Sequence, residues 1–385
     1  MCVHTSIVLM NLMSRIRSLA NPNNLIRFTG LLTLWIALHV YAARPLLVAA
    51  SAEGIAPLIA WSVVLLMPFV SMLPLIASRS DALRFRSFAH WTGYLTMSIF
   101  STLLVVVLTS DLLRLSLKIA RATISAPTMS FVTIAVAGLL AFVGLVQARR
   151  PRVVSLQIPA SLDYRLVQWS DVHIGPTIQR RFVESLVERT NALNADAVVI
   201  TGDLVDGHVD DLRHAIEPLR DLRARDGVFV VTGNHEYYWR ASEWVKEFER
   251  LGLTFLKNEH RVVSPNLVIA GVTDPAGRDT HKPDTQAALA GAPRDAFRIL
   301  LAHRPQAAQD ASRLGVDLQL SGHTHGGQFF PFNLLIRWFQ PVVAGLHRVG
   351  DMLLYVSRGT GYWGPPSRLG VGGEITLIEL VREAS

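Results

Sequence analysis

Long apolar stretches dominate the chain up to residue 150, whereas the rest alternates short apolar runs with polar segments. Four of the long stretches carry few charges. Each is close to the roughly 20 residues that a helix needs to cross the hydrocarbon core of a membrane. The pattern predicts a transmembrane domain of about four helices at residues 24–150, after a cytoplasmic segment at residues 1–23. The expected spans are Leu25–Ala43, Ile55–Ala77, Trp91–Thr109 and Thr128–Val146.

The remaining residues, 151–385, show a different periodicity. Short apolar runs bounded by turn residues are typical of buried strands. Between some of them, apolar residues recur at helical spacing with charges in between, as in a surface helix. Alternating strands and helices predict an α/β domain over this range. The expected strands include Arg165–Trp169, Ala197–Ile200, Val228–Val231, Ile299–Leu301 and Val316–Leu320, and the expected helices are Gln179–Leu193, Asp210–Arg223 and Ser242–Leu251.

The distribution of charge adds an orientation. The formal net charge is +7, and many arginines flank the apolar stretches rather than interleaving with aromatic residues. We therefore expect no nucleic-acid partner. Nine arginines lie on one side of the predicted spans and four basic residues on the other, which predicts a multi-pass protein of the inner (cytoplasmic) membrane with its C-terminal domain in the cytoplasm. The nine are Arg15, Arg17, Arg27, Arg79, Arg84, Arg86, Arg149, Arg150 and Arg152, and the four are Arg44, Arg114, Lys118 and Arg121.

Polar clusters follow the predicted strands of the C-terminal domain. Their carboxylate, amide and imidazole groups are the donors that hold divalent metals. The carboxyl ends of strands are also where open α/β sheets bind ligands. One such cluster is an ordinary turn, but five in succession are not expected of a packed core. The clusters are Asp171-Val172-His173, Gly202-Asp203, Gly233-Asn234-His235-Glu236, His303 and Gly322-His323-Thr324-His325.

In this order the clusters resemble the calcineurin-like metallophosphoesterase family, over roughly Leu166 to Leu380. The Gly-Gly-Gln sequence after His325 and the segment Gly359–Pro366 are similar to the membrane-associated bacterial branch of that family. The resemblance implies a four-layer α-β-β-α sandwich, with two mixed sheets face to face and helices outside. Periodicity by itself predicts only the α/β class. The resemblance further implies an enzyme, a metal-dependent phosphoesterase (hydrolase).

Carried over position by position, the resemblance implies two divalent metal ions, of Mn, Fe, Zn or Ni. One ion would be held by Asp171, His173, Asp203 and His325, and the other by Asp203, Asn234, His303 and His323. A hydroxide that bridges the metals would then attack phosphorus. His235, next to a ligand, would protonate the leaving group as general acid, although support of the Asn234 loop is an alternative role. Asp206 would either orient its neighbours or cap a helix.

A markedly apolar stretch, Phe329–Phe339, follows the last histidines directly. It is either a buried strand and turn or an apolar wall beside the metals, suited to acyl chains. In the second case Phe332 and Trp338 would contact lipid. Arg337 and Arg348 would then meet phosphate oxygens or anionic head groups.

Three functions remain open at this point. The first is hydrolysis of a phosphodiester or pyrophosphate bond in a lipid-linked substrate. The second is a phosphodiesterase or phosphatase for soluble nucleotides or phosphomonoesters, with the helices only as an anchor. The third is a non-enzymatic metal-binding scaffold or sensor, against which the complete ligand set counts. The expected partners are a phosphate ester and membrane lipids.

Overall fold

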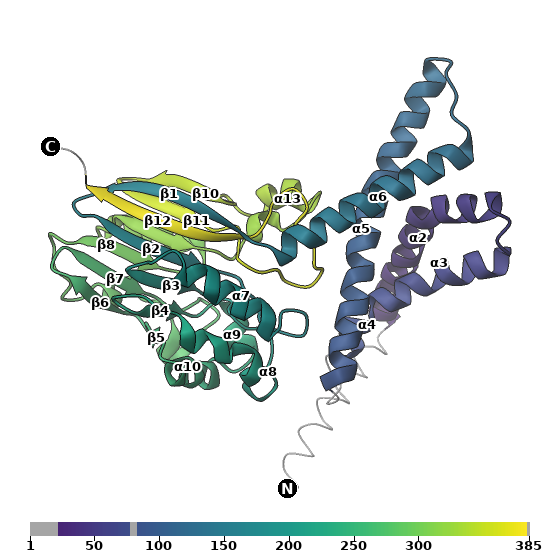
Figure 1. Ribbon diagram of the computed structural model, residues 1–385. Helices are drawn as coiled ribbons and strands as arrows, with labels where there is room; N and C mark the ends of the chain where they lie inside the picture. The colour runs from purple at the N-terminus through teal and green to yellow at the C-terminus, as the bar shows by residue number, and fades with distance from the viewer. Residues whose placement is uncertain (1–21, 78–82, 383–385) are drawn as a thin grey trace, which may run out of the picture. The chain divides into compact units, whose positions relative to one another are not determined.

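The computed structural model in Figure 1 describes residues 22–77 and 83–382. Of the predicted cytoplasmic segment, residues 1–21 lie outside the described part, as does Arg79. The chain divides into two compact units. One consists of residues up to Leu73 together with Ile99–Gly138, and the other of Pro74–Ser98 together with Leu139–Ser385. We describe each unit by itself.

Apolar helices account for the first unit. Three helices of the described chain are long and apolar enough to cross a membrane: α2 (Pro22–Ala52), α5 (Leu83–Ile119) and α6 (Ala126–Arg149). The second predicted span is not one helix. It divides into α3 (Pro57–Ser71) and α4 (Leu73–Ala77), because Pro74 has no N–H to continue the hydrogen bonding of α3. The 15 residues of α3 extend only about 22 Å, short of the hydrocarbon thickness.

The second unit contains two six-stranded sheets. The first has the strand order β1-β12-β2-β3-β4-β5, in which β2 to β5 are parallel and β12 is antiparallel to β2. Its strands are β1 (Arg152–Ala160), β2 (Tyr164–Trp169), β3 (Ala197–Thr201), β4 (Val228–Val231), β5 (Thr254–Phe255) and β12 (Glu374–Arg382). Each of the five predicted strands is present, with ends within two residues of the prediction.

The second sheet has the order β10-β11-β9-β8-β7-β6. Its four central strands are parallel, and its two edge strands are antiparallel to their neighbours. The strands are β6 (Glu259–Ser264), β7 (Leu267–Gly271), β8 (Phe297–Leu301), β9 (Leu318–Ser321), β10 (Gly345–Val349) and β11 (Met352–Val356). Both sheets are therefore mixed, as the family resemblance implied.

Side chains alternate between two cores along each strand. In β3, Val199 packs between the two sheets, against residues such as Ile299, whereas Ile200 faces the outer helices. The helices α7 (Arg180–Asn191), α8 (Val209–Ile216) and α10 (Ala241–Arg250) complete that outer core, and α11 (Thr285–Ala288) and α12 (Ala308–Arg313) cover the second sheet. This arrangement confirms the four-layer α-β-β-α sandwich (Figure 1). The predicted helix Asp210–Arg223 is interrupted, since α8 gives way to a 3-10 helix at Glu217–Asp221.

The ends of two apolar helices belong to this second unit as well. Ala148 of α6 is 1% exposed and lies in the core beneath α7. The carbonyl of Gly144 accepts a 3.0 Å hydrogen bond from the Arg368 N–H. At the start of α5, Arg86 pairs with Asp211 of α8 at 2.5 Å. The sandwich and these helix ends are thus packed as one body.

Candidate metal centre

Seven residues with metal-binding side chains, called here the metal-type residues, gather at the carboxyl ends of the strands. Those of the first sheet follow three adjacent parallel strands, β2, β3 and β4, and those of the second follow the adjacent strands β8 and β9. Parallel neighbours end at the same edge, so the topology by itself brings the loops together. The residues are Asp171, His173, Asp203, Asn234, His303, His323 and His325.

Asp203 lies at the middle of the group. Its Oδ2 is 3.3 Å from His303 Nε2 and 3.8 Å from His173 Nε2. Its Oδ1 is occupied instead by the backbone N–H of His235, at 2.9 Å. The carboxylate is 2% exposed. One fixed oxygen therefore faces imidazoles on both sides, which is the arrangement that a bridging ligand requires.

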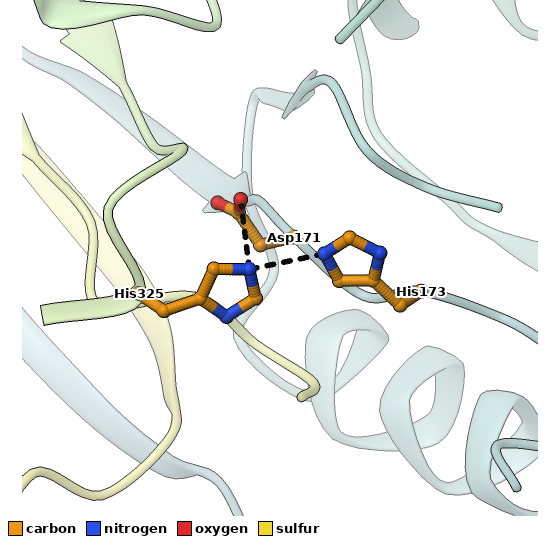
Figure 2. Close-up of side chains that lie close together, drawn as sticks. All are labelled: Asp171, His173 and His325. Carbon is orange, nitrogen blue, oxygen red and sulfur yellow. Dashed lines mark hydrogen bonds and ion pairs between the residues drawn. The ribbon is translucent and has the colours of Figure 1, made fainter. Parts of the chain in front are cut away.

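Two pairs of imidazole rings face each other through nitrogen atoms. His173 Nε2 and His325 Nε2 are 3.0 Å apart, and Asp171 Oδ1 is 3.4 Å from the latter (Figure 2). In the other pair, His323 Nδ1 is 3.1 Å from His303 Nε2. A neutral imidazole has one donor and one acceptor nitrogen, so direct contact uses only one lone pair of each facing pair. A cation between the rings would use both.

Two further observations fit a metal. The Oδ1 atom of Asn234 is buried and has no hydrogen-bond partner among the described residues, although a buried acceptor without a partner costs about 1–3 kcal/mol. His303 Nδ1 lies 2.9 Å from the Thr201 carbonyl and must donate to it, which leaves Nε2 directed at Asp203. Such second contacts commonly orient histidines that bind metals. The residues present could hold divalent ions.

Burial and charge set the protonation of the group. Burial lowers the pKa of His173 to about 3 and that of His323 to about 4, which keeps both rings neutral, as metal ligands must be. Burial also raises the pKa of Asp171 to about 6. Burial opposes the charged forms of Asp203 and His303, but their mutual attraction holds the pKa of Asp203 well below its usual range and raises that of His303 to about 10. This pair shares a proton that a metal would have to displace.

The backbone at the site is strained. Five of the eleven non-glycine residues with positive φ in the described chain are metal-type residues. Left-handed backbone is uncommon for such residues and accumulates at functional sites. Hydrogen bonds between loops maintain it, since the Asp171 N–H donates to the Gly202 carbonyl at 3.1 Å. The five are Asp171, His173, Asp203, His323 and His325.

Glycines allow the loops to approach. A Cβ at Gly322 would overlap Ser170 Oγ and Asp171 Oδ2, and one at Gly233 would overlap Asp203 Oδ1. These two positions explain why a glycine precedes the histidines after β9 and the asparagine after β4. Any larger residue there would displace a carboxylate of the centre.

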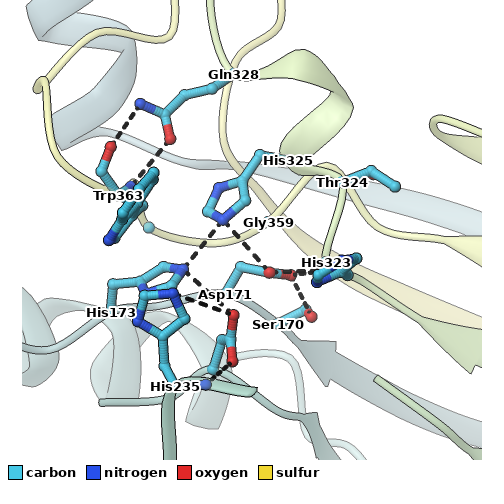
Figure 3. Close-up of polar contacts among 12 residues, drawn as sticks. Ser170, Asp171, His173, His235, His323, Thr324, His325, Gln328, Gly359 and Trp363 are labelled. Atoms are coloured by element: carbon cyan, nitrogen blue, oxygen red, sulfur yellow. Dashed lines mark hydrogen bonds and ion pairs between the residues drawn. The ribbon is translucent and has the colours of Figure 1, made fainter. Parts of the chain in front are cut away.

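His235, the predicted general acid, borders the metal-type residues. Its Nδ1 is 3.1 Å from Asp206 Oδ1, which also accepts the Trp239 indole N–H at 2.8 Å. Burial would lower the pKa of His235, but the hydrogen bond to Asp206 and the nearby carboxylates raise it. On its open side His235 faces the exposed ring of Trp363. The Gln328 side chain holds the Trp363 backbone by two hydrogen bonds, donating to its carbonyl and accepting from its N–H (Figure 3). Asp206 thus contacts His235 and is not the N-cap of α8, which is His208.

Glu236 is a residue whose role the sequence did not reveal. Its fully buried carboxylate accepts hydrogen bonds from four backbone N–H groups and so ties the loop after β3 to the loop after β4. Burial, with a contribution from Asp203, raises its pKa to about 7. The donors are Asp203 at 3.1 Å, Leu204 at 2.8 Å, Val205 at 3.2 Å and Gly233 at 2.7 Å. The sequence offered one signal for this role, namely that Glu236 is an acidic residue within the cluster Gly233–Glu236 that follows a buried strand.

Arg368 is a second residue whose role the sequence did not reveal. It is fully buried and donates to the carbonyls of Gly361, His325 and Arg358, with Nη2 3.1 Å from His325 Nδ1. Burial lowers its pKa to about 10. The guanidinium therefore supports the loop that carries His325. No local pattern around Arg368 in the sequence indicates this contact.

The apolar stretch after the histidines is not a buried strand, so that interpretation is wrong. It forms α13 (Phe332–Leu335) and a 3-10 helix (Ile336–Trp338). Trp338 is 80% exposed and Phe332 43%, because only Ile336 turns inward toward Gly327. Arg337 and Arg348 are exposed, and neither forms a hydrogen bond or ion pair with a metal-type residue of the described chain.

Comparison with known proteins gives the family. Residues 164–327 match the family model described as calcineurin-like phosphoesterase. An uncharacterized metallophosphoesterase of Aquifex aeolicus is 31% identical over 229 residues, which cover 58% of this chain and 87% of the relative. The chain belongs to the calcineurin-like metallophosphoesterase family.

Other relatives extend the comparison. A zebrafish (Danio rerio) protein named "Transmembrane protein with metallophosphoesterase domain" is 41% identical over 266 residues, which cover 64% of this chain. The chain spans 61% of the length of that relative. A solved 5'-nucleotidase precursor of Thermus thermophilus is 15% identical, with a TM-score of 0.35, over 57% of this chain and 55% of the other. The family, together with the names of these relatives, supports the conclusion that this chain is a metal-dependent hydrolase.

Proposed function

We propose that this chain is a membrane-bound phosphoesterase that uses two divalent metal ions to hydrolyse a phosphodiester or pyrophosphate bond of a lipid-linked substrate. The observation that carries the proposal is the convergence of carboxylate and imidazole groups around Asp203 Oδ2, with His303 Nε2 at 3.3 Å. In the proposed assignment, Asp203 would contribute to both metal sites. Asp171, His173 and His325 would complete one set, and Asn234, His303 and His323 would complete the other.

The proposed chemistry divides between the ions and His235. When bound, the ions supply positive charge to the phosphate oxygens and lower the pKa of the attacking water. His235 gives its proton to the departing oxygen, since the Asp206 carboxylate favours the protonated ring. Its backbone N–H also fixes Asp203 Oδ1, so one residue orients the carboxylate and provides the acid. Arg368 and Glu236 position the loops without touching substrate.

The exposed apolar segment favours a lipid-linked substrate over a soluble one. Exposed aromatic and aliphatic side chains from Phe330 to Phe339 follow within a few residues of His325. Gly327 brings Asn333 and Ile336 against the turn that carries this histidine. Contiguous exposed apolar surface of this kind marks contact with membranes or apolar ligands. In the proposal Phe332 and Trp338 contact acyl chains, and Arg337 and Arg348 lie near the head groups.

We further propose that the helices span the cytoplasmic membrane and that the metal centre lies in the cytoplasm. The start of α5 and the end of α6 both belong to the unit that carries the centre. Arginines mark these two ends, with Arg84 and Arg86 on α5 and Arg149 and Arg150 at the end of α6. This placement follows the excess of arginine on the cytoplasmic side of membrane proteins.

The experiment is a comparison of leaving groups in the variant His235→Ala. Loss of a general acid should lower kcat about 10²–10⁴-fold for a diester with an alkyl leaving group. A nitrophenyl ester departs without protonation and should lose far less. Tyr238→Phe is a matched control, because this exposed neighbour of His235 keeps its ring. Equal losses on both esters would contradict the assigned role.

A further inference from the structure

A basic cavity is lined by residues where α6 ends and leads into β1, and by residues of α7. Figure 1 shows these three elements. Its volume is about 370 Å³, within the range of sites that bind small ligands. Three arginines and a serine supply polar groups to its lining, and three apolar residues line it as well. These residues are Arg149, Arg150, Arg189, Ser185, Pro151, Phe182 and Leu186. None of them belongs to the metal-type residues.

The charges around this cavity are not neutralised. No carboxylate lines it, and none of its three arginines forms an ion pair within the described residues. Arg149 is held in place, because it donates to the Thr177 carbonyl at 3.1 Å and lies 5.3 Å over the Phe182 ring. The side chains of Arg150 and Arg189 form no hydrogen bond with any residue that the structure describes. Three like charges around one cavity favour an anion, and arginine is suited to phosphate oxygens.

The cavity also has apolar residues at its base, and its place at the end of α6 indicates its level relative to the membrane. Phe182 is 5% exposed and Leu186 1%, so both are core side chains that form a fixed floor and leave little carbon surface open to the cavity. Arg149 ends α6 and Arg150 follows it; among the three helices that could span a membrane, α6 contains the most apolar window of 18 residues, with a mean hydropathy of 2.4. Arg149 also lies 5.6 Å over the ring of Trp91, and tryptophan is enriched at the membrane interface. A basic pocket at the end of a spanning helix lies at the level of lipid head groups.

We propose that this cavity binds the phosphate of an anionic phospholipid head group. Phosphate oxygens would contact Arg150, Arg189 and the Ser185 hydroxyl, and the acyl chains would extend from the cavity along the membrane. Free phosphate shares the charge, but the position of the cavity at the end of a spanning helix favours the lipid. The inference rests on the proposed membrane insertion of α6 and is independent of the hydrolytic activity.

The test is native mass spectrometry of the full-length protein in detergent with phosphatidylglycerol or phosphatidylcholine. Wild type should retain one phosphatidylglycerol in preference to phosphatidylcholine. Each arginine near an anionic lipid contributes a factor of about five, so Arg150→Gln with Arg189→Gln should weaken that binding about 30-fold. The control pair is Arg181→Gln with Arg294→Gln, two exposed arginines outside the cavity with no ion pair in the described chain. It removes the same charge and should bind like wild type.

The outcomes separate the possibilities. Equal binding by the cavity variant and wild type, or equal weakening in the control pair, would overturn the inference. Displacement of the lipid by inorganic phosphate alone would assign the cavity to a free anion and likewise overturn it. Hydrolysis of a soluble diester is measured on the same samples. Active wild type without lipid preference would refute this inference alone, whereas inactive protein that binds the lipid would refute only the proposed function.

Discussion

The contact between Asp206 and His235 leads to a measurable shift in pH dependence. Asp206→Asn keeps the size of the side chain and an oxygen for Trp239, but removes the negative charge 3.1 Å from His235 Nδ1. That charge raises the pKa of His235 against the effect of burial. Without it the pKa of His235 should fall. The ring then loses its proton at a lower pH, and the loss of activity on the alkaline side should begin at a lower pH.

The size of the shift follows from the hydrogen bond. Bonds to charged partners contribute about 1.5–3 kcal/mol, against about 1 kcal/mol for neutral ones. The difference, about 1–2 kcal/mol, corresponds to about a tenfold weaker affinity of the His235 ring for its proton. Asp206→Asn should therefore move the descending limb of the kcat profile about one pH unit lower for a diester with a poor leaving group. The ascending limb should stay in place, because it does not depend on this proton.

The assay is the pH profile of kcat at saturating metal, with an alkyl ester and a nitrophenyl ester compared. Asp210→Asn serves as the control, because this exposed carboxylate of α8 carries the same charge without contacting His235. The nitrophenyl profile should be nearly unchanged in both variants. A folded, metal-loaded Asp206→Asn protein whose alkyl-ester profile does not move, or moves upward, would refute the reasoning.

Two other predictions concern the membrane. Replacing Phe332 and Trp338 with serine should raise KM several-fold for a lipid substrate only; both side chains are exposed, so stability should change by at most about 0.5 kcal/mol. Parallel losses on a soluble diester, with a lower melting temperature, would count against the lipid contact. Alkaline phosphatase fused after Ser385 should be inactive, because it requires the periplasm, while a reporter that requires the cytoplasm should be active. Strong phosphatase activity from the fusion would reverse the proposed topology.

Much of the sandwich could be predicted because local patterns determine it. The strand Val228–Val231 is a short apolar run between polar turns, and the structure has β4 at these same residues. The metal-type residues were found because each follows such a run. Their meeting at one edge depends on the order of parallel strands, which periodicity does not contain. That part came only from the family resemblance.

Other features depend on contacts that are distant in the chain. Arg368 is 43 residues from His325, whose carbonyl it binds, and nothing near it indicates burial. The apolar residues around Trp338 were compatible with a core strand, because composition does not tell which face is covered. The second apolar stretch was long enough to span a membrane, but Pro74 divides it into α3 and α4. In each case tertiary structure or a backbone constraint decided what local composition left open.

The two-metal centre is the central claim, and metal content tests it most directly. Elemental analysis of fully loaded wild type should give about two divalent ions per chain. Asp203→Asn should give less than about one, because the proposed bridging carboxylate contacts both ions. The variant should remain folded by circular dichroism. One ion or fewer in wild type, or two retained by folded Asp203→Asn, would contradict the account.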